Sequence, residues 1–235
     1  MEFIVVEHSP QIRENLCYIL LTLGVKGIPV ANKDEALEIL KNKDISGAII
    51  DVDNKEVEGL KLIEEIKHNE KTRNIHIIVH SVQSQKEFVL KMVEMGVVGY
   101  LLKPMEEETT TEKLKKILQK LETHRLERKH IRVKPDPEEI PRLHFRLTEY
   151  PKLISGKILD ISMGGVAVEL FNPPPEGVLQ PKMKIPSIQF TLLNKQINAE
   201  GEIVIARGNV IAIKFTNIPR EDSINLAKYI FKQIS

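Results

Sequence analysis

In the first half of the chain, short runs of β-branched and other apolar residues alternate with amphipathic helical stretches. The apolar runs are continuous, which is typical of strands buried on both faces of a parallel sheet. The five predicted strands are Phe3–Val6, Gly27–Val30, Ala48–Asp51, Ile75–Val79 and Gly99–Leu102. The alternation predicts an α/β fold with a doubly wound parallel sheet over residues 1–120.

Pairs of polar residues at capping spacing mark the predicted starts of three helices. In a capping box, a side-chain oxygen at the helix start accepts a hydrogen bond from an N–H group three residues later. The pairs are Asn32 with Glu35, Ser84 with Glu87, and Thr109 with Glu112.

The pattern changes in the second half of the chain. A charged linker is predicted over residues 121–137, because Pro135 and Pro137 end any helix there. Short strand patterns separated by turn residues then favour antiparallel pairing. The predicted strands are Leu143–Leu147, Leu153–Ile161, Gly165–Leu170, Ile188–Leu193, Ile197–Ala206 and Val210–Phe215, followed by a helix over Ser223–Ile234. Residues 138–235 are therefore predicted to form a small antiparallel barrel, all-β apart from its C-terminal helix.

Composition narrows the classes of protein. The 235 residues are 42% hydrophobic and 29% charged, with a formal net charge of +1. That balance is typical of a globular protein and gives no overall electrostatic case for nucleic acid or an anionic membrane. Cys17 is the single cysteine and is expected to be a buried apolar residue. The acidic start, Met1-Glu2, is unlike a signal peptide, and no apolar run approaches the roughly 18 residues of a membrane span. We expect a cytoplasmic protein with no membrane insertion.

Polar residues follow several of the predicted parallel strands. Glu7 and His8 follow the first, Asp51 ends the third, and Ser81 and Lys103 follow the fourth and fifth. Because the carboxyl ends of parallel strands meet at one edge, we expect these side chains to lie together. An acid there can act as a nucleophile, while a hydroxyl and an ammonium hold phosphoryl oxygens.

These positions resemble the receiver domain of two-component response regulators. The segments that carry the resemblance are Ile4–Pro10, Asp51 with Glu58–Leu60, Ser81-Val82 and Gly99–Pro104. The resemblance implies that Asp51 is the phosphoacceptor, with a histidine kinase as partner. It also implies that Ser81 and Tyr100 rearrange on phosphorylation and that Lys103 contacts the phosphoryl group. A cis bond is expected at Lys103-Pro104.

Two departures from the receiver pattern affect the expected metal site. The family has two adjacent carboxylates where this chain has Glu7 and His8. Glu7 and Asp51 are the candidate Mg²⁺ ligands, but an imidazole is a poor ligand for this hard ion, so we expect weakened affinity. Asp53 stands where the family pattern differs and is a candidate extra carboxylate. Two interpretations stay open: Asp51 is phosphorylated, or the receiver is degenerate and serves as a scaffold or a homodimer platform.

A second set of residues lies in the linker and at one turn of the predicted barrel. Arg128 and Arg132 are four residues apart, and by themselves indicate only a solvated charged face. Asp160, Ser162 and Gly165 lie within six residues, and by themselves indicate only a turn between strands. Arginine presents donors that match phosphate, and an aspartate can accept from the N–H edge of guanine.

Together the two sets resemble the RxxxR and DxSxxG motifs of the PilZ family, over residues 125–235. The resemblance implies that the ligand is cyclic di-GMP. Arg128 and Arg132 would hold its phosphates and guanine edges or stack on a base. Asp160 and Ser162 would contact a guanine, and Gly165 would keep the turn tight. Glu127, just before the first arginine, favours one bound molecule per protomer through charge repulsion.

No enzyme is predicted, because the chain lacks a triphosphate-binding loop, a CxxC pair and an ordered Ser/His/Asp set. His76 and His80 are interpreted as satisfied core histidines. The first hypothesis is a regulator in which cyclic di-GMP orders the linker, coupled to phosphorylation of Asp51, with a downstream protein partner that the sequence does not identify. The alternative is an interaction adaptor with no physiological ligand. A nucleic-acid regulator rests only on the basic linker.

Overall fold

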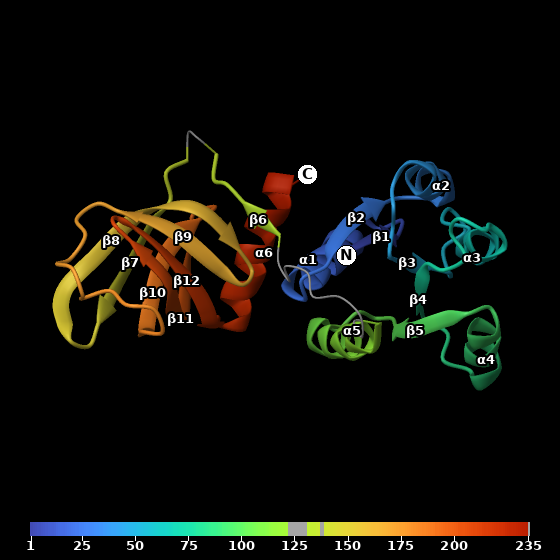
Figure 1. The fold of residues 1–235 in the computed structure, drawn as a ribbon. Helices are drawn as coiled ribbons and strands as arrows, with labels where there is room; N and C mark the ends of the chain where they lie inside the picture. The colour runs from blue at the N-terminus through green and yellow to red at the C-terminus, as the bar shows by residue number, and fades with distance from the viewer. Residues whose placement is uncertain (122–130, 137–138, 235) are drawn as a thin grey trace. The chain divides into compact units, whose positions relative to one another are not determined.

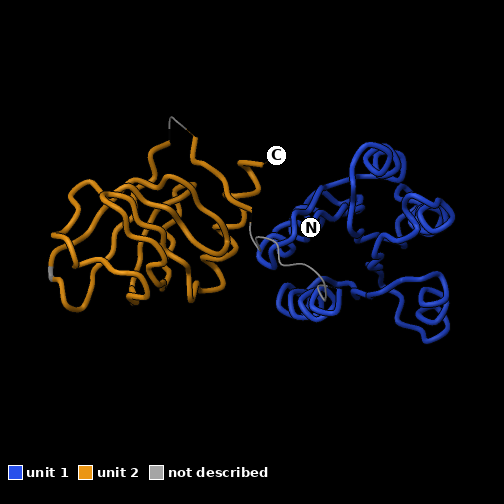
Figure 2. Tube along the Cα trace, viewed as in Figure 1, with its two compact units in different colours: residues 1–127 blue, residues 128–235 orange. Residues whose placement is uncertain are grey.

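A computed structural model describes residues 1–121, 131–136 and 139–234. The chain divides into two compact units, Met1–Glu127 and Arg128–Ser235 (Figure 2). The division falls inside the linker predicted over residues 121–137. Each unit has its own sheet and its own buried core.

The first unit is a five-stranded parallel sheet with strand order β2-β1-β3-β4-β5. Its strands are β1 (Glu2–Val6), β2 (Lys26–Val30), β3 (Gly47–Asp51), β4 (His76–Ser81) and β5 (Val97–Leu102). Its helices are α1 (Pro10–Thr22), α2 (Lys33–Asn42), α3 (Gly59–His68), α4 (Lys86–Glu94) and α5 (Glu107–Leu121). Helices α1 and α5 lie on one side of the sheet, and α2, α3 and α4 on the other (Figure 1). The predicted fold and all five strands are confirmed, with ends shifted by one or two residues.

One of the three predicted capping boxes is confirmed. The Asn32 side chain accepts from the N–H of Glu35 at 3.0 Å, and α2 begins there. The second is wrong, because α4 has Gln85 at its cap position and no side-chain cap. The third is also wrong: α5 begins at Glu107, so Thr109 lies inside the helix and donates instead to Glu106 at 3.0 Å. The spacing identified each helix but located the first residue of only one.

The second unit is a closed six-stranded antiparallel barrel. Around the barrel the order is β8-β7-β10-β11-β12-β9, and β9 pairs with β8 to close it. The strands are β7 (Arg142–Leu147), β8 (Tyr150–Ser162), β9 (Gly165–Leu170), β10 (Lys184–Leu192), β11 (Lys195–Arg207) and β12 (Val210–Asn217). A two-residue strand, β6 (Arg132–Val133), adds to the end of β8, and α6 (Arg220–Ile234) follows the barrel. Barrel and helix are as predicted.

Alternation along the barrel strands explains its core. Along β7, Leu143, Phe145 and Leu147 are buried while Arg142 and Arg146 are exposed, as expected for a sheet with one wet face. Phe190 of β10 stacks on Phe215 of β12 with ring centroids 6.0 Å apart. The buried strand faces thereby close around a single apolar interior.

The expectation for Cys17 is confirmed. Cys17 is buried in α1, and burial raises the pKa of its thiol to about 12, so it behaves as an apolar residue. None of the helices that the structure describes has both the length and the apolar composition needed to cross a bilayer.

We predict that Asn32→Ala will destabilise the first unit by about 1 kcal/mol, because one N–H at the start of α2 loses its partner. Ser84→Ala is the matched control and should leave stability within about 0.5 kcal/mol, since Ser84 makes no cap. Urea unfolding followed by circular dichroism measures both. Equal losses in the two variants would contradict the assignment of the caps.

Candidate functional site

The C-terminal edge of the parallel sheet brings together the polar residues predicted to meet there. Lys103, just after β5, donates from Nζ to Oδ1 of Asp51 at 2.6 Å. The same ammonium lies 3.7 Å from Oε2 of Glu7 and 3.5 Å from Oδ2 of Asp53. Ser81 ends β4 within hydrogen-bond reach of Asp53. We call this cluster the rim. The Lys103-Pro104 bond is cis, as expected.

Glu7 and His8 have different surroundings, although they are adjacent in the chain. Glu7 is buried, and its Oε2 lies 3.2 Å from Nδ1 of His80 while its Oε1 accepts from the N–H of Ser9 at 3.1 Å. The side chain of His8 is exposed. His80 is 1% exposed, and its Nε2 has no partner among the described residues. The expectation of a satisfied His80 therefore holds for one ring nitrogen, and the sequence did not indicate Glu7 as its partner.

Asp53 is the rim residue whose role the sequence left least defined. Its Oδ1 accepts from the Ser81 hydroxyl at 2.6 Å, and its Oδ2 accepts from the N–H of Val82 at 2.8 Å. Its own N–H donates to Oδ1 of Asp51 at 2.9 Å. Asp53 therefore connects the ends of β3 and β4 through its side chain and its backbone.

The ion pairs shift the pKa values at the rim. Burial alone would raise the pKa of Glu7, but His80, the Ser9 N–H and the charge of Lys103 hold it below its ordinary 4.5. Burial has the same sign at Asp53, where Ser81, Val82 and Lys103 hold the pKa below 3.8. Burial would lower the pKa of Lys103, but its carboxylate neighbours raise it above 10.5. Both carboxylates and the ammonium are thus stabilised in their charged forms.

The predicted magnesium ligands do not fit a divalent ion well. Glu7 has both oxygens bonded to other groups, and Oδ1 of Asp51 accepts from Lys103 and from the Asp53 N–H. No cluster of three acidic, histidine or cysteine side chains that could hold a metal is found in the part of the chain that the structure describes. Mg²⁺ needs several oxygen ligands at near-octahedral positions. The rim already has its cation in Lys103.

On the barrel, the two-residue strand β6 brings one motif arginine beside the second motif. Arg132 pairs with Ser162 across β6 and β8, and its guanidinium contacts Oδ1 of Asp160 at 3.1 Å. The arginine side chain is 54% exposed and that of Asp160 29%. The structure therefore places Arg132 and Asp160 together on the barrel surface. Arg128 and Glu127 lie outside the described residues, so the position of the first motif arginine is untested.

Ser162 and Gly165 shape the turn between β8 and β9. The Ser162 hydroxyl is buried, donates to the carbonyl of Gly165 at 3.2 Å and accepts from the N–H of Gly164 at 3.2 Å. A Cβ atom on Gly165 would lie 2.4 Å from the carbonyl oxygen of Ile213, so any side chain would force β9 away from β12. Glycine is required here because two backbones approach closely. The expected contact of Ser162 with guanine stays a prediction.

Strand register extends this site across the barrel. Lys214 of β12, Gly165, Ser162 and Arg132 occupy one row over β12, β9, β8 and β6. The neighbouring row holds Ala212, Ala167 and Asp160. Lys214 and Arg132 are exposed, and the side chains of Ala212 and Ala167 are small. The surface therefore has a basic group at each end of one row and little side-chain bulk over part of the other. We call these two rows the ligand surface.

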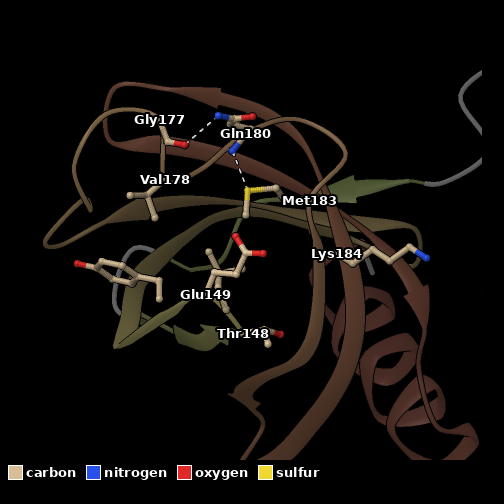
Figure 3. Close-up of a pocket in the computed structure, with 9 residues that line it drawn as sticks. Thr148, Glu149, Gly177, Val178, Gln180, Met183 and Lys184 are labelled. Carbon is tan, nitrogen blue, oxygen red and sulfur yellow. Dashed lines mark hydrogen bonds between the residues drawn. The ribbon is translucent and has the colours of Figure 1, made fainter.

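A separate hollow of about 530 Å³ lies elsewhere on the barrel (Figure 3). The turn between β7 and β8, including Thr148 and Glu149, forms one side, and the segment from Gly177 to Lys184 forms the other. Within it, Nε2 of Gln180 donates to the carbonyl of Gly177 at 2.9 Å. Of the predicted ligand residues that the structure describes, none lines this hollow, so it is distinct from the ligand surface.

Comparison with known protein families finds a separate match for each half of the chain. The profile of the response regulator receiver domain matches residues 3–115, and that of the PilZ domain matches residues 127–232. The first half is 25% identical over 122 residues to chemotaxis protein CheY-3 of Vibrio cholerae, covering 52% of this chain and 94% of that protein. It is 29% identical over 120 residues to a CheY homolog of Campylobacter jejuni, covering 50% and 92%. A response regulator structure from Thermotoga maritima aligns with a TM-score of 0.45 and 28% identity, covering 50% of this chain and 97% of that one.

We predict that Lys103→Met will destabilise the first unit by about 1.5–3 kcal/mol at pH 7, because three carboxylates lose their shared cation. Groups with lowered pKa stabilise the fold above their unfolded pKa and lose this effect as pH falls through the folded value. The difference from wild type should therefore shrink at pH 4, where carboxylates without Lys103 take up protons. Lys43→Met, an exposed lysine at the end of α2, is the control. A loss in Lys103→Met that does not depend on pH would contradict this account.

Proposed function

Because the chain joins a response regulator receiver domain to a PilZ domain, we propose that it is a signalling regulator that binds cyclic di-GMP on the ligand surface. Both domains belong to non-catalytic signalling families, which supports a regulator over an enzyme. The observation that carries the proposal is the position of Arg132, which pairs with Ser162 across β6 and β8 and contacts the carboxylate of Asp160.

The chemistry of this pair supports a ligand with guanine and phosphate groups. An arginine presents a planar fork of donors that matches phosphate oxygens or the acceptor edge of guanine. A carboxylate accepts hydrogen bonds and suits the donor edge of the same base. An exposed ion pair contributes only about 0–1 kcal/mol, so Arg132 can exchange Asp160 for a ligand at little cost.

The rest of the ligand surface supports the same class of ligand. Lys214 supplies a second cation at the far end of the row from Arg132. Ala167 and Ala212 lie in the same row as Asp160, and their small side chains suit the approach of a flat base. In this proposal Arg128 adds a further cation, and Glu127 favours one bound molecule.

The proposed response is ordering of the linker. Arg132 already lies on the barrel in β6, and Arg128 precedes it by four residues, so a ligand shared by the two arginines would fix the segment before β6 against the barrel. The sequence leaves two interpretations open, one in which a histidine kinase phosphorylates Asp51 as a second input and one in which the receiver is degenerate. The ion pairs around Asp51 favour cyclic di-GMP as the dominant input.

An interaction adaptor is the second candidate, and the rim is the observation that favours it. Glu7, Asp51 and Asp53 already form ion pairs or hydrogen bonds with groups of the same chain. This is expected of a receiver domain that serves as a surface for binding other proteins. The two candidates differ in one measurable property, since an adaptor with no physiological ligand does not bind cyclic di-GMP.

We predict that the full chain binds cyclic di-GMP and that Arg132→Ala weakens the affinity by about tenfold or more. A charge-assisted contact contributes about 1.5–3 kcal/mol, and each 1.4 kcal/mol is about tenfold in affinity. Isothermal titration calorimetry gives both affinities. Arg146→Ala removes an exposed arginine on β7 and should bind like wild type.

Two results would contradict the proposal in different ways. No heat of binding from wild type at tens of micromolar would favour the adaptor. Equal affinities for wild type and Arg132→Ala would show that the ligand binds elsewhere on the chain.

A further inference from the structure

The Asp53 carboxylate occupies a site made of donors from two strand ends. It accepts the Ser81 hydroxyl at 2.6 Å and the Val82 N–H at 2.8 Å, and it lies 3.5 Å from the Lys103 ammonium. A hydroxyl, a backbone N–H and an ammonium that converge in this way form an anion site. The anion in this site is a side chain of the same chain.

Two of these donors, Ser81 and Lys103, are the hydroxyl and the ammonium that the sequence predicts would hold the oxygens of a phosphoryl group on Asp51. Asp51 lies next to the site, since Lys103 and the Asp53 N–H both donate to its Oδ1. A phosphoryl group on Asp51 would therefore compete with Asp53 for Ser81 and Lys103. It would also bring about two negative charges near the carboxylates of Glu7 and Asp53, which lie 3.7 Å and 3.5 Å from the same ammonium.

Further contacts extend the hold of Asp53 to Tyr100. The Ser81 hydroxyl oxygen accepts from the N–H of Gln83 at 3.1 Å, and the Tyr100 hydroxyl donates to the carbonyl of Gln83 at 2.7 Å. The Tyr100 ring packs edge-on against Phe88 of α4, with centroids 6.5 Å apart. Residues 81–83 are thus held by Asp53 on one side and by Tyr100 on the other.

We infer that Asp53 is a resident anion that takes the place of a phosphoryl group and holds residues 81–83 and Tyr100 in an anion-bound arrangement without phosphorylation. Asp53 is a positioning residue, because it acts through Ser81, Val82 and Lys103. The receiver half then has one arrangement at its rim whether or not a kinase is present. This inference is independent of ligand binding by the barrel.

The direct test is amide hydrogen exchange in the full chain, measured by NMR at single-residue resolution. Asp53→Ala should speed exchange at Val82 and Gln83 by about tenfold or more, because a charged acceptor is lost and the segment opens locally. Asp44→Ala removes an exposed carboxylate after α2 and should leave both amides at the wild-type rate. Equal exchange at Val82 in wild type and Asp53→Ala would overturn the inference.

Two further measurements keep the test decisive. If Asp53→Ala does not fold, Asp53→Asn keeps an oxygen acceptor but loses the charge, and exchange at Val82 should still be faster than in wild type. Wild type treated with acetyl phosphate and Mg²⁺ should show no added phosphoryl mass and unchanged exchange at residues 81–83. Ready labelling of Asp51, or new protection of Val82 on treatment, would each overturn it.

Discussion

The rim of the first domain depends on the ion pairs that the Lys103 ammonium forms with three carboxylates. The ammonium lies within 3.7 Å of all three, which come from the ends of β1 and β3 and from the loop that follows β3. Three like charges converge there only because the carboxyl ends of parallel strands meet at one edge. A cation must offset their repulsion, and Lys103 after β5 does so at 17% exposure, where screening by water is weak. The same ammonium thus pairs with both candidate metal ligands, Glu7 and Asp51.

The barrel follows a different constraint, the close approach of two backbones at one turn. Gly165 lets β9 lie against β12. The Ser162 hydroxyl forms hydrogen bonds with backbone groups of Gly164 and Gly165 in the turn between β8 and β9. Because β6 adds to β8 beside this turn, Arg132 comes next to Asp160. Arg132 of the first motif and Asp160 of the second, which are 28 residues apart, thereby lie on one surface. The anion site at the rim is filled from within the chain, whereas the cations on the barrel lie on an exposed face.

The sequence predicted the elements well and the contacts between them only in part. Buried runs and alternation gave every long strand, because burial is recorded directly in residue type. The rim was predictable from the rule for parallel sheets. Its pairings were not: Glu7 and His80 are 73 residues apart, and Ser81 and Asp53 are 28 apart. Such pairs depend on strand register and side-chain direction. For the same reason Gly165 was assigned to the turn, although its requirement comes from Ile213 on another strand.

The central claim is that cyclic di-GMP is the signal to which this protein responds and that the rim around Asp51 does not respond to a phosphoryl donor as a second signal. The most direct test is calorimetric titration of the full chain with cyclic di-GMP, before and after treatment with acetyl phosphate and Mg²⁺. The account predicts binding with the same affinity in both samples. Binding that appears or tightens only after treatment would contradict it, and so would the absence of binding in both.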